Sequence, residues 1–200
     1  MLTNKEQSLI IKEETFCSNT YHPLPVVLER GKGPYVWDVN NKKYFDFLSA
    51  YSAVNQGHCN NEILDVFINQ AKKLTLTSRA FYNSELGESL EYINNAFGYD
   101  KMLPMNSGAE AVETAIKAAR RWAYRSKKIE SNKAEIIVAN GNFHGRTTTI
   151  ISFSSESNSK DDFGPHTPGF VSVEFGSVDA VKDAINENTA AVLFEPIQGE

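Results

Sequence analysis

The sequence predicts an α/β protein. Most of the chain is expected to form a mostly parallel sheet that is covered by helices on both faces. Continuous apolar runs at 135–139, 170–175 and 190–194 are typical of strands that are buried on both faces. Helical patterns at 109–127 and 177–185 lie between them. Strands that alternate with helices favour a parallel sheet, and ligands of such sheets lie at the carboxyl ends of the strands.

The composition is that of an ordinary globular protein. An apolar content of 41% and a charged content of 22% over 200 residues suffice for one sizeable core, and they exclude a disordered chain. The net charge is -5, and acidic and basic residues are interspersed along the chain. This pattern excludes a basic face for nucleic acid and a polybasic stripe for a membrane. Small-molecule chemistry is therefore favoured.

The cysteines and the amino terminus indicate a cytoplasmic protein. Cys17 and Cys59 lie far apart and show neither a CxxC spacing nor a Cys/His ligand spacing, so the sequence indicates neither a disulfide framework nor a zinc site. Residues 1–20 match neither a secretory signal nor an Arg-rich transit peptide. No apolar run approaches the length of a membrane span.

Residues 1–60 are predicted to form a small amino-terminal α+β segment with a β-meander. Three β-branched or aromatic runs are typical of strands: 26–28, 35–39 and 44–47. Turn residues at 31–34 and 40–41 separate them.

Residues 61–200 are predicted to form the first part of a large α/β domain that continues beyond residue 200. Asn60 is expected to cap a helix, and a second helix is expected after Ser84. Their expected buried faces consist of Ile63, Leu64, Phe67, Ile68, Ala71 and Leu74, and of Leu86, Leu90, Ile93 and Phe97. A short strand at 102–103 and a long loop at 154–169 complete the pattern.

The turn at Ser107 and Gly108 precedes a long helix. A hydroxyl and exposed N–H groups at the positive end of a helix dipole suit a phosphate dianion, and glycine allows close approach. The same residues are also typical of an ordinary capped helix, so the local pattern leaves both interpretations open.

Two further polar groups follow predicted strands. Phe143, His144 and Arg146 lie in the loop after 135–139, where an aromatic ring can stack on a ligand and an arginine can bind a carboxylate. Glu195 and Glu200 follow the last strand. Each of these two sets alone is also typical of solvated or capping residues. Together with the turn at Ser107 and Gly108 they make three candidate sets at one edge of the sheet, which indicates a site.

Three motifs carry a resemblance to a known family. Met105-Asn106-Ser107-Gly108-Ala109-Glu110-Ala111, Gly141-Asn142-Phe143-His144-Gly145-Arg146-Thr147 and Phe194-Glu195-Pro196-Ile197-Gln198-Gly199-Glu200 resemble the class-III, fold-type I pyridoxal-phosphate aminotransferases, in this order. The resemblance extends from about Tyr21 to Glu200, including Arg30-Gly31-Lys32-Gly33, Trp37-Asp38 and Tyr44-Phe45-Asp46-Phe47.

Within that family the chain resembles the ornithine aminotransferases more than the acetylornithine or 4-aminobutyrate branches. Tyr21 and the segments 49–58 and 78–83 carry this similarity, and the other branches tend to have an apolar residue in place of Tyr51. Two departures are His144 after Phe143, as in the acetylornithine branch, and Asn60-Asn61 in place of His-Pro.

The resemblance implies a pyridoxal 5'-phosphate site. Its phosphate is expected on Ser107, Gly108 and Ala109, its ring on Phe143, and Glu195 is expected to orient it. Tyr21 and Arg146 are expected to bind the substrate carboxylate, and Tyr51 is expected to contact the ornithine headgroup. Glu200 is the fourth residue expected at the substrate. No metal site is expected.

The implied activity transfers the δ-amino group of L-ornithine to 2-oxoglutarate, giving glutamate 5-semialdehyde and glutamate, as in proline biosynthesis and arginine degradation. A homodimer is also implied. The Schiff-base lysine is expected beyond Glu200, so these 200 residues are expected to be inactive alone. The alternatives are an acetylornithine or 4-aminobutyrate aminotransferase and, from a different class, a non-catalytic phosphate-binding module.

Overall fold

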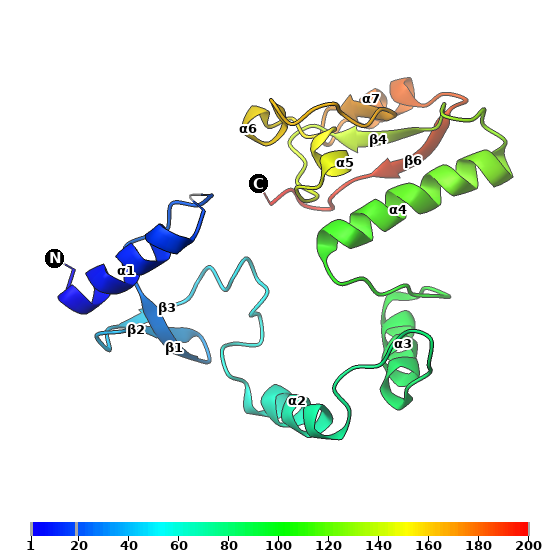
Figure 1. Ribbon diagram of the computed structural model, residues 1–200. Coiled ribbons are helices and arrows are strands. Elements are labelled where there is room, and N and C mark those ends of the chain that lie inside the picture. The colour runs from blue at the N-terminus through cyan, green and yellow to red at the C-terminus, as the bar shows by residue number, and fades with distance from the viewer. Residues whose placement is uncertain (1, 19, 200) are drawn as a thin grey trace. The chain divides into compact units, whose positions relative to one another are not determined.

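The computed structural model describes residues 2–18 and 20–199 (Figure 1). They form two compact units, one up to Gly87 and one from Glu88 onward. The expected domain boundary at residue 60 stays a prediction. None of the helices in the described residues is both long and apolar enough to cross a membrane.

The first unit opens with helix α1, Asn4–Phe16, which was not predicted. Its first turn is closed by a capping box: the Glu6 carboxylate accepts from the Thr3 backbone N–H at 2.7 Å, and Thr3 Oγ1 accepts from Glu6 N–H at 3.3 Å. The backbone and side-chain hydrogen bonds from Thr3 lower the pKa of Glu6. The pattern Thr-x-x-Glu before an apolar run was the sequence signal for this helix.

A three-stranded antiparallel meander follows, in the order β1-β2-β3. Its strands are β1 (Leu28–Lys32), β2 (Tyr35–Asp38) and β3 (Lys43–Phe45). The expected first strand at 26–28 is wrong, because pairing with β2 runs from Leu28 to Lys32 and leaves only Gly33 and Pro34 for the turn. The residues 31–32, expected in a turn, are therefore part of a strand.

Asp38 fastens the second turn of the meander. Its buried carboxylate accepts hydrogen bonds from Asn40 N–H and Lys42 N–H at 2.9 Å and from the Tyr44 hydroxyl at 2.8 Å. Burial pushes the pKa of Asp38 upward, but these bonds outweigh it and hold that pKa below its ordinary value. The carboxylate is thus charged and supports the loop between β2 and β3.

Helices α2 (Asn61–Lys73) and α3 (Ser84–Phe97) confirm the two helices expected here. Asn60 caps α2 by accepting from Ile63 N–H at 3.3 Å. The expected burial is wrong for both helices, because neither has a buried residue. On α3, Leu86, Leu90 and Ile93 are half-buried and Phe97 is 72% exposed. Neither apolar stripe packs extensively on another helix or strand among the described residues.

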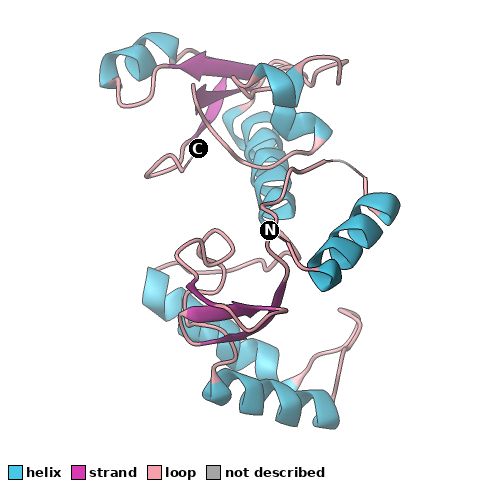
Figure 2. Ribbon diagram, turned by 90° about the vertical axis from the view of Figure 1, so that its left-hand side faces the viewer, coloured by secondary structure: helices cyan, strands magenta, loops and turns pink. Residues whose placement is uncertain are grey.

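The second unit holds three parallel strands in the order β5-β4-β6, drawn in magenta in Figure 2 with the strands of the meander. The strands are β4 (Glu135–Ala139), β5 (Phe170–Val173) and β6 (Thr189–Leu193). The parallel α/β fold predicted from alternating strands and helices is confirmed. The expected strand at 102–103 is wrong: it pairs with no described residue and precedes Pro104, which lacks an N–H.

Four α-helices and a π-helix accompany the sheet among the described residues. They are α4 (Gly108–Trp122), which continues into the π-helix η1 (Ala123–Lys127), α5 (Thr148–Ile151), α6 (Ser157–Lys160) and α7 (Val178–Ala184). Ser177 caps α7 as predicted, accepting from Ala180 N–H at 3.1 Å. The short helix α6 lies in the segment expected to be loop throughout.

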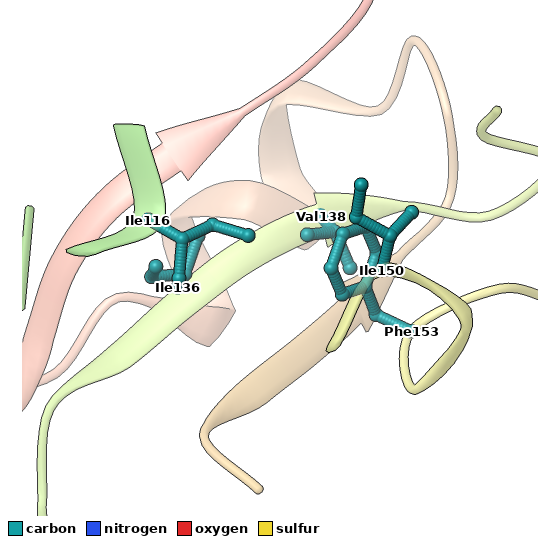
Figure 3. Close-up of a cluster of buried hydrophobic side chains, with 5 residues drawn as sticks. All are labelled: Ile116, Ile136, Val138, Ile150 and Phe153. Atoms are coloured by element: carbon teal, nitrogen blue, oxygen red, sulfur yellow. The ribbon is translucent and has the colours of Figure 1, made fainter. Parts of the chain in front are cut away.

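The core of this unit lies on β4. Ile136 and Val138 project from one face of the strand and pack with Ile116 of α4, Ile150 of α5 and Phe153 (Figure 3). Ile137, on the opposite face, is also fully buried. β4 is therefore the central strand, and burying each such side chain stabilises the fold by about 1.5–3 kcal/mol.

Candidate functional site

The site lies where β4 and β6 end side by side. The loop 140–147 follows β4 and Glu195 follows β6, and Phe143 N–H donates to the Glu195 carboxylate at 3.1 Å. Gln198 makes a second link, because its side-chain amide donates to the Asn140 carbonyl at 2.7 Å. The motifs after the two strands therefore meet at the carboxyl edge of the sheet, as the sequence predicted.

The start of α4 meets the same loop. Gly145 has φ +122°, and a Cβ at this position would lie 3.1 Å from the Ala109 Cβ, a closer contact than side chains usually make. Thr147 Oγ1 donates to Glu113 Oε1 at 2.5 Å, one turn further along the helix. The turn that carries Ser107 and the loop that carries Phe143 are thus packed on each other.

Asn142 holds the inside of the loop. Its side chain is 5% exposed, and its amide donates to the carbonyls of Ala139 at 2.6 Å and Phe153 at 3.1 Å. Sequence analysis did not single out Asn142, Glu113 or Thr147. The position of Asn142 in a short loop after an apolar strand was the available signal for it. The Glu113–Thr147 contact spans 34 residues and has no local signal.

His144 points inward rather than to solvent. Its ring lies 5.9 Å from that of Phe153, and its buried Nε2 has no hydrogen-bond partner among the described residues. Burial lowers the pKa of His144, and the nearby Glu195 carboxylate opposes this only in part. The imidazole is therefore neutral at physiological pH and packs as part of the loop.

Phe143 and Arg146 lie at the open side of the loop. The Phe143 side chain is 44% exposed, and the Arg146 guanidinium carbon lies 5.8 Å from its ring centroid. The ring is therefore accessible for stacking, with a cation beside it.

The first turn of α4 offers donors suited to an anion. Ser107 caps the helix by accepting from Glu110 N–H at 3.2 Å, and no described residue accepts from the N–H groups of Gly108 or Ala109. A Cβ built on Gly108 meets nothing within 4 Å, so the backbone is open to a ligand. Glu110 is engaged elsewhere, since its carboxylate accepts from Asn106 N–H at 2.8 Å. Hydroxyl, N–H groups and helix dipole together fit a phosphate dianion.

This edge belongs to the second unit, which does not contain every candidate residue. Tyr21 and Tyr51 belong to the first unit, where they are 65% and 79% exposed. Tyr21 borders a groove of about 500 Å³ beside α1, together with Leu9, Cys17 and Leu24. Glu200 lies outside the described residues. No group of three His, Cys, Asp or Glu side chains suited to a metal ion occurs in the described part of the chain.

The second unit is a parallel α/β fold, and the residues at this edge form a candidate site whose chemistry suits an anionic ligand with an aromatic ring. Residues 16–200 match the family described as aminotransferase class-III. The chain belongs to this family, and its fold is that of the fold-type I enzymes.

Relatives and solved structures agree with that assignment. The ornithine aminotransferase of Brevibacillus brevis is 53% identical over 98% of this chain and 49% of its own length, and the mitochondrial ornithine aminotransferase of Rattus norvegicus is 54% identical over 94% and 43%. The ornithine aminotransferase of Toxoplasma gondii superposes with a TM-score of 0.95 at 41% identity, covering 100% of this chain and 47% of that one. A structure of the Toxoplasma gondii ornithine aminotransferase crystallised in the presence of oxidised glutathione shows partial occupancy of PLP at its active site.

An acetylornithine aminotransferase is also similar. The enzyme of Elizabethkingia anophelis matches with a TM-score of 0.82 and 48% identity over 99% of this chain and 46% of its own. The resemblance to the ornithine aminotransferases noted from the motifs is confirmed by the curated relatives. The chain spans about half the length of the curated relatives that it matches.

Proposed function

We propose that the protein containing these residues is a pyridoxal-phosphate-dependent ornithine aminotransferase. It transfers the δ-amino group of L-ornithine to 2-oxoglutarate and yields glutamate 5-semialdehyde and glutamate. The observation that carries the proposal is the convergence at one sheet edge: Phe143 N–H on Glu195 at 3.1 Å, and Gly145 against Ala109.

The residues at this edge fit pyridoxal phosphate. Ser107, Gly108 and Ala109 hold the phosphate, because a hydroxyl and free N–H groups lie at the start of a 15-residue helix. Phe143 supports the ring on its exposed face. When bound, the cofactor supplies an electron sink for bond changes at the substrate amine. Glu195 orients the loop that carries the aromatic, and with it the ring.

Substrate recognition is assigned to four residues. Arg146 binds a carboxylate, since its guanidinium lies beside the exposed Phe143 ring. Tyr21 assists it, Tyr51 donates a hydrogen bond to the ornithine headgroup, and Glu200 alternates between substrates by pairing with an arginine elsewhere in the protein. Support for the ornithine assignment comes from the identity of 53% with the Brevibacillus brevis enzyme.

The test uses the complete protein loaded with cofactor. L-ornithine and 2-oxoglutarate are supplied together, and glutamate 5-semialdehyde and glutamate are measured as products. Tyr51→Ile is expected to lower kcat/KM for ornithine by at least tenfold while cofactor absorbance is retained, because a hydrogen bond to a charged headgroup contributes about 1.5–3 kcal/mol. Unchanged ornithine turnover in this variant would exclude the role of Tyr51.

Acetylornithine aminotransferase is the second candidate. The pair Phe143–His144 and the 48% identity with the Elizabethkingia anophelis enzyme favour it. Acetylornithine in the same assay separates the two: a higher kcat/KM for acetylornithine than for ornithine would replace the first proposal. A protein that binds inorganic phosphate and shows no transamination with either substrate would instead be a non-catalytic module.

The Schiff-base lysine is proposed to lie outside these 200 residues. In that case the isolated 200-residue chain, mixed with pyridoxal phosphate, gives no visible absorbance band that borohydride removes. The complete protein gives such a band. A borohydride-sensitive band from the 200 residues alone would contradict the assignment.

Assembly and compartment are also part of the proposal. A homodimer is supported by the exposed apolar stripe of α2, which includes Ile63 and Phe67 at 55% and 68% exposure. A cytoplasmic location is supported by Cys17 and Cys59, which are both free and exposed. Analytical ultracentrifugation and cell fractionation test these two statements.

A further inference from the structure

The turn that carries Tyr51 has an unusual backbone. Ser49, Ala50, Tyr51 and Ser52 have φ values of 51°, 48°, 56° and 68°, so four successive non-glycine residues are left-handed. Ser52 N–H donates to the Leu48 carbonyl at 3.4 Å, as in one turn of a left-handed helix. Such residues cost about 1–2 kcal/mol each relative to right-handed ones. A conformation of this kind persists only where the surrounding structure holds it.

Two hydrogen bonds between Ser49 and Val54 close the base of this turn, called its neck below. Val54 N–H donates to the Ser49 carbonyl at 3.0 Å, and the Ser49 hydroxyl donates to the Val54 carbonyl at 2.9 Å. The two ends of the turn are therefore joined to each other. Something else must attach the neck to the meander.

Asp46 makes that attachment. One carboxylate oxygen accepts from Ser49 N–H at 2.8 Å, and the other contacts His58 Nε2 at 2.7 Å. Asp46 N–H donates to the Pro34 carbonyl at 3.0 Å. The carboxylate thus bridges the start of the left-handed turn to a histidine twelve positions from it in sequence.

His58 is itself held by the tip of the β1–β2 hairpin. Its backbone exchanges two hydrogen bonds of 2.8 Å with Gly33. Its ring lies against Gly31, where a Cβ would come within 2.6 Å of the His58 Cγ. The missing side chain of Gly31 therefore provides the space for the imidazole that contacts Asp46.

We propose that Asp46 and His58 are positioning residues that hold the left-handed 49–52 turn, and through it Tyr51, in the geometry used for substrate selection. This proposal rests on the proposed function, in which Tyr51 contacts the amino acid headgroup. Asp46 and His58 touch neither substrate nor cofactor in this role. They act on Tyr51 alone.

The kinetic test uses Asp46→Asn in the complete, cofactor-loaded protein. The variant is expected to raise KM for ornithine about tenfold, with kcat and the absorbance spectrum of the cofactor nearly unchanged, because one hydrogen bond of a charged group is lost. Tyr51→Phe is expected to do the same. The double variant is expected to be no worse than Tyr51→Phe, since Asp46 acts only through Tyr51. Additive losses in the double variant would overturn the proposal.

The matched control is Asp38→Asn. Asp38 is a buried carboxylate of the same meander, but it accepts from residues 40–44 and not from the turn. It tests whether any loosening of the meander raises KM. An equal rise in KM for Asp38→Asn and Asp46→Asn would overturn a specific role of Asp46.

A second measurement does not depend on turnover. Amide hydrogen exchange of 48–54 is expected to become at least tenfold faster in Asp46→Asn, while that of 135–139 is unchanged. Adding Ala50→Gly is expected to restore part of the protection, because glycine adopts positive φ without the Cβ penalty. If exchange in 48–54 is unaltered, the positioning role fails even where ornithine is turned over. If ornithine is not turned over by the unmodified protein, the proposed function fails while the exchange result still decides the positioning role.

Discussion

The backbone N–H of Phe143 donates to the Glu195 carboxylate across 3.1 Å, although 52 residues separate the two in the sequence. The contact joins the loop after β4 to the end of β6, so the aromatic and the acid of the site take one fixed arrangement. Its consequences for the site are open to direct measurement.

Replacing Glu195 by Ala is expected to weaken cofactor binding by about 10- to 100-fold, the effect of losing a charged hydrogen-bond acceptor worth about 1.5–3 kcal/mol. Glu195→Gln keeps an acceptor for Phe143 N–H and is expected to lose less. Titration of the complete apoprotein with pyridoxal phosphate, followed by absorbance, measures this. Glu187→Ala, an exposed acid of the same unit, is the control. Equal affinities of Glu195→Ala and the control would contradict the prediction.

Gly145→Ala is expected to destabilise the loop and lower cofactor affinity. The new Cβ would lie 3.1 Å from the Ala109 Cβ at φ +122°, so both contact and backbone oppose it, at a cost of about 1–3 kcal/mol.

Gly176→Ala supplies the comparison, because Gly176 also has positive φ, +82°, but a Cβ there meets nothing within 4 Å. Urea unfolding compares the two. If Gly176→Ala costs as much as Gly145→Ala, the packing of Gly145 on α4 is unimportant.

Ser107→Ala is expected to lower both stability and phosphate affinity. Removal of a capping hydroxyl costs about 1 kcal/mol, and the same hydroxyl is assigned to the cofactor phosphate. Ser177→Ala is matched to it, because Ser177 caps α7 at 3.1 Å as Ser107 caps α4 at 3.2 Å. The two variants should be similarly destabilised, but only Ser107→Ala should bind pyridoxal phosphate more weakly. Equal cofactor affinities would reduce Ser107 to a helix cap.

His144 is expected to make stability depend on pH. Burial lowers the pKa of His144 in the folded protein below its ordinary value of 6.5, so the unfolded chain binds the proton more readily. Stability is therefore highest above that value and falls as the pH decreases from about 7 to about 5. His144→Gln cannot titrate, and its unfolding midpoint in urea should vary less over this range. An identical pH dependence in the two proteins would rule out a contribution from His144.

Local information in the sequence accounts for the elements that were predicted correctly. The caps Asn60 and Ser177 each precede an amphipathic run, and the run 135–139 is apolar throughout, so neighbouring residues alone indicate a capped helix or a buried strand. β1 was misplaced because its register is decided by pairing with β2 up to Lys32. The strand expected at 102–103 failed because no described residue pairs with it.

The candidate site divides in the same way. The sequence alone was enough to identify the candidate residues Ser107, Phe143, Arg146 and Glu195. Their order, after strands and before a helix, indicated the aminotransferase family. The tertiary structure alone decided that Gly145 packs on Ala109, that Thr147 bonds Glu113, that the Nε2 atom of His144 is buried, and that Tyr51 lies on a left-handed turn. These features depend on residues that are distant in the sequence and meet only in the folded protein, or on a backbone conformation that such residues hold in place. Helix propensity, capping and apolar pattern act only between residues that are close in the sequence.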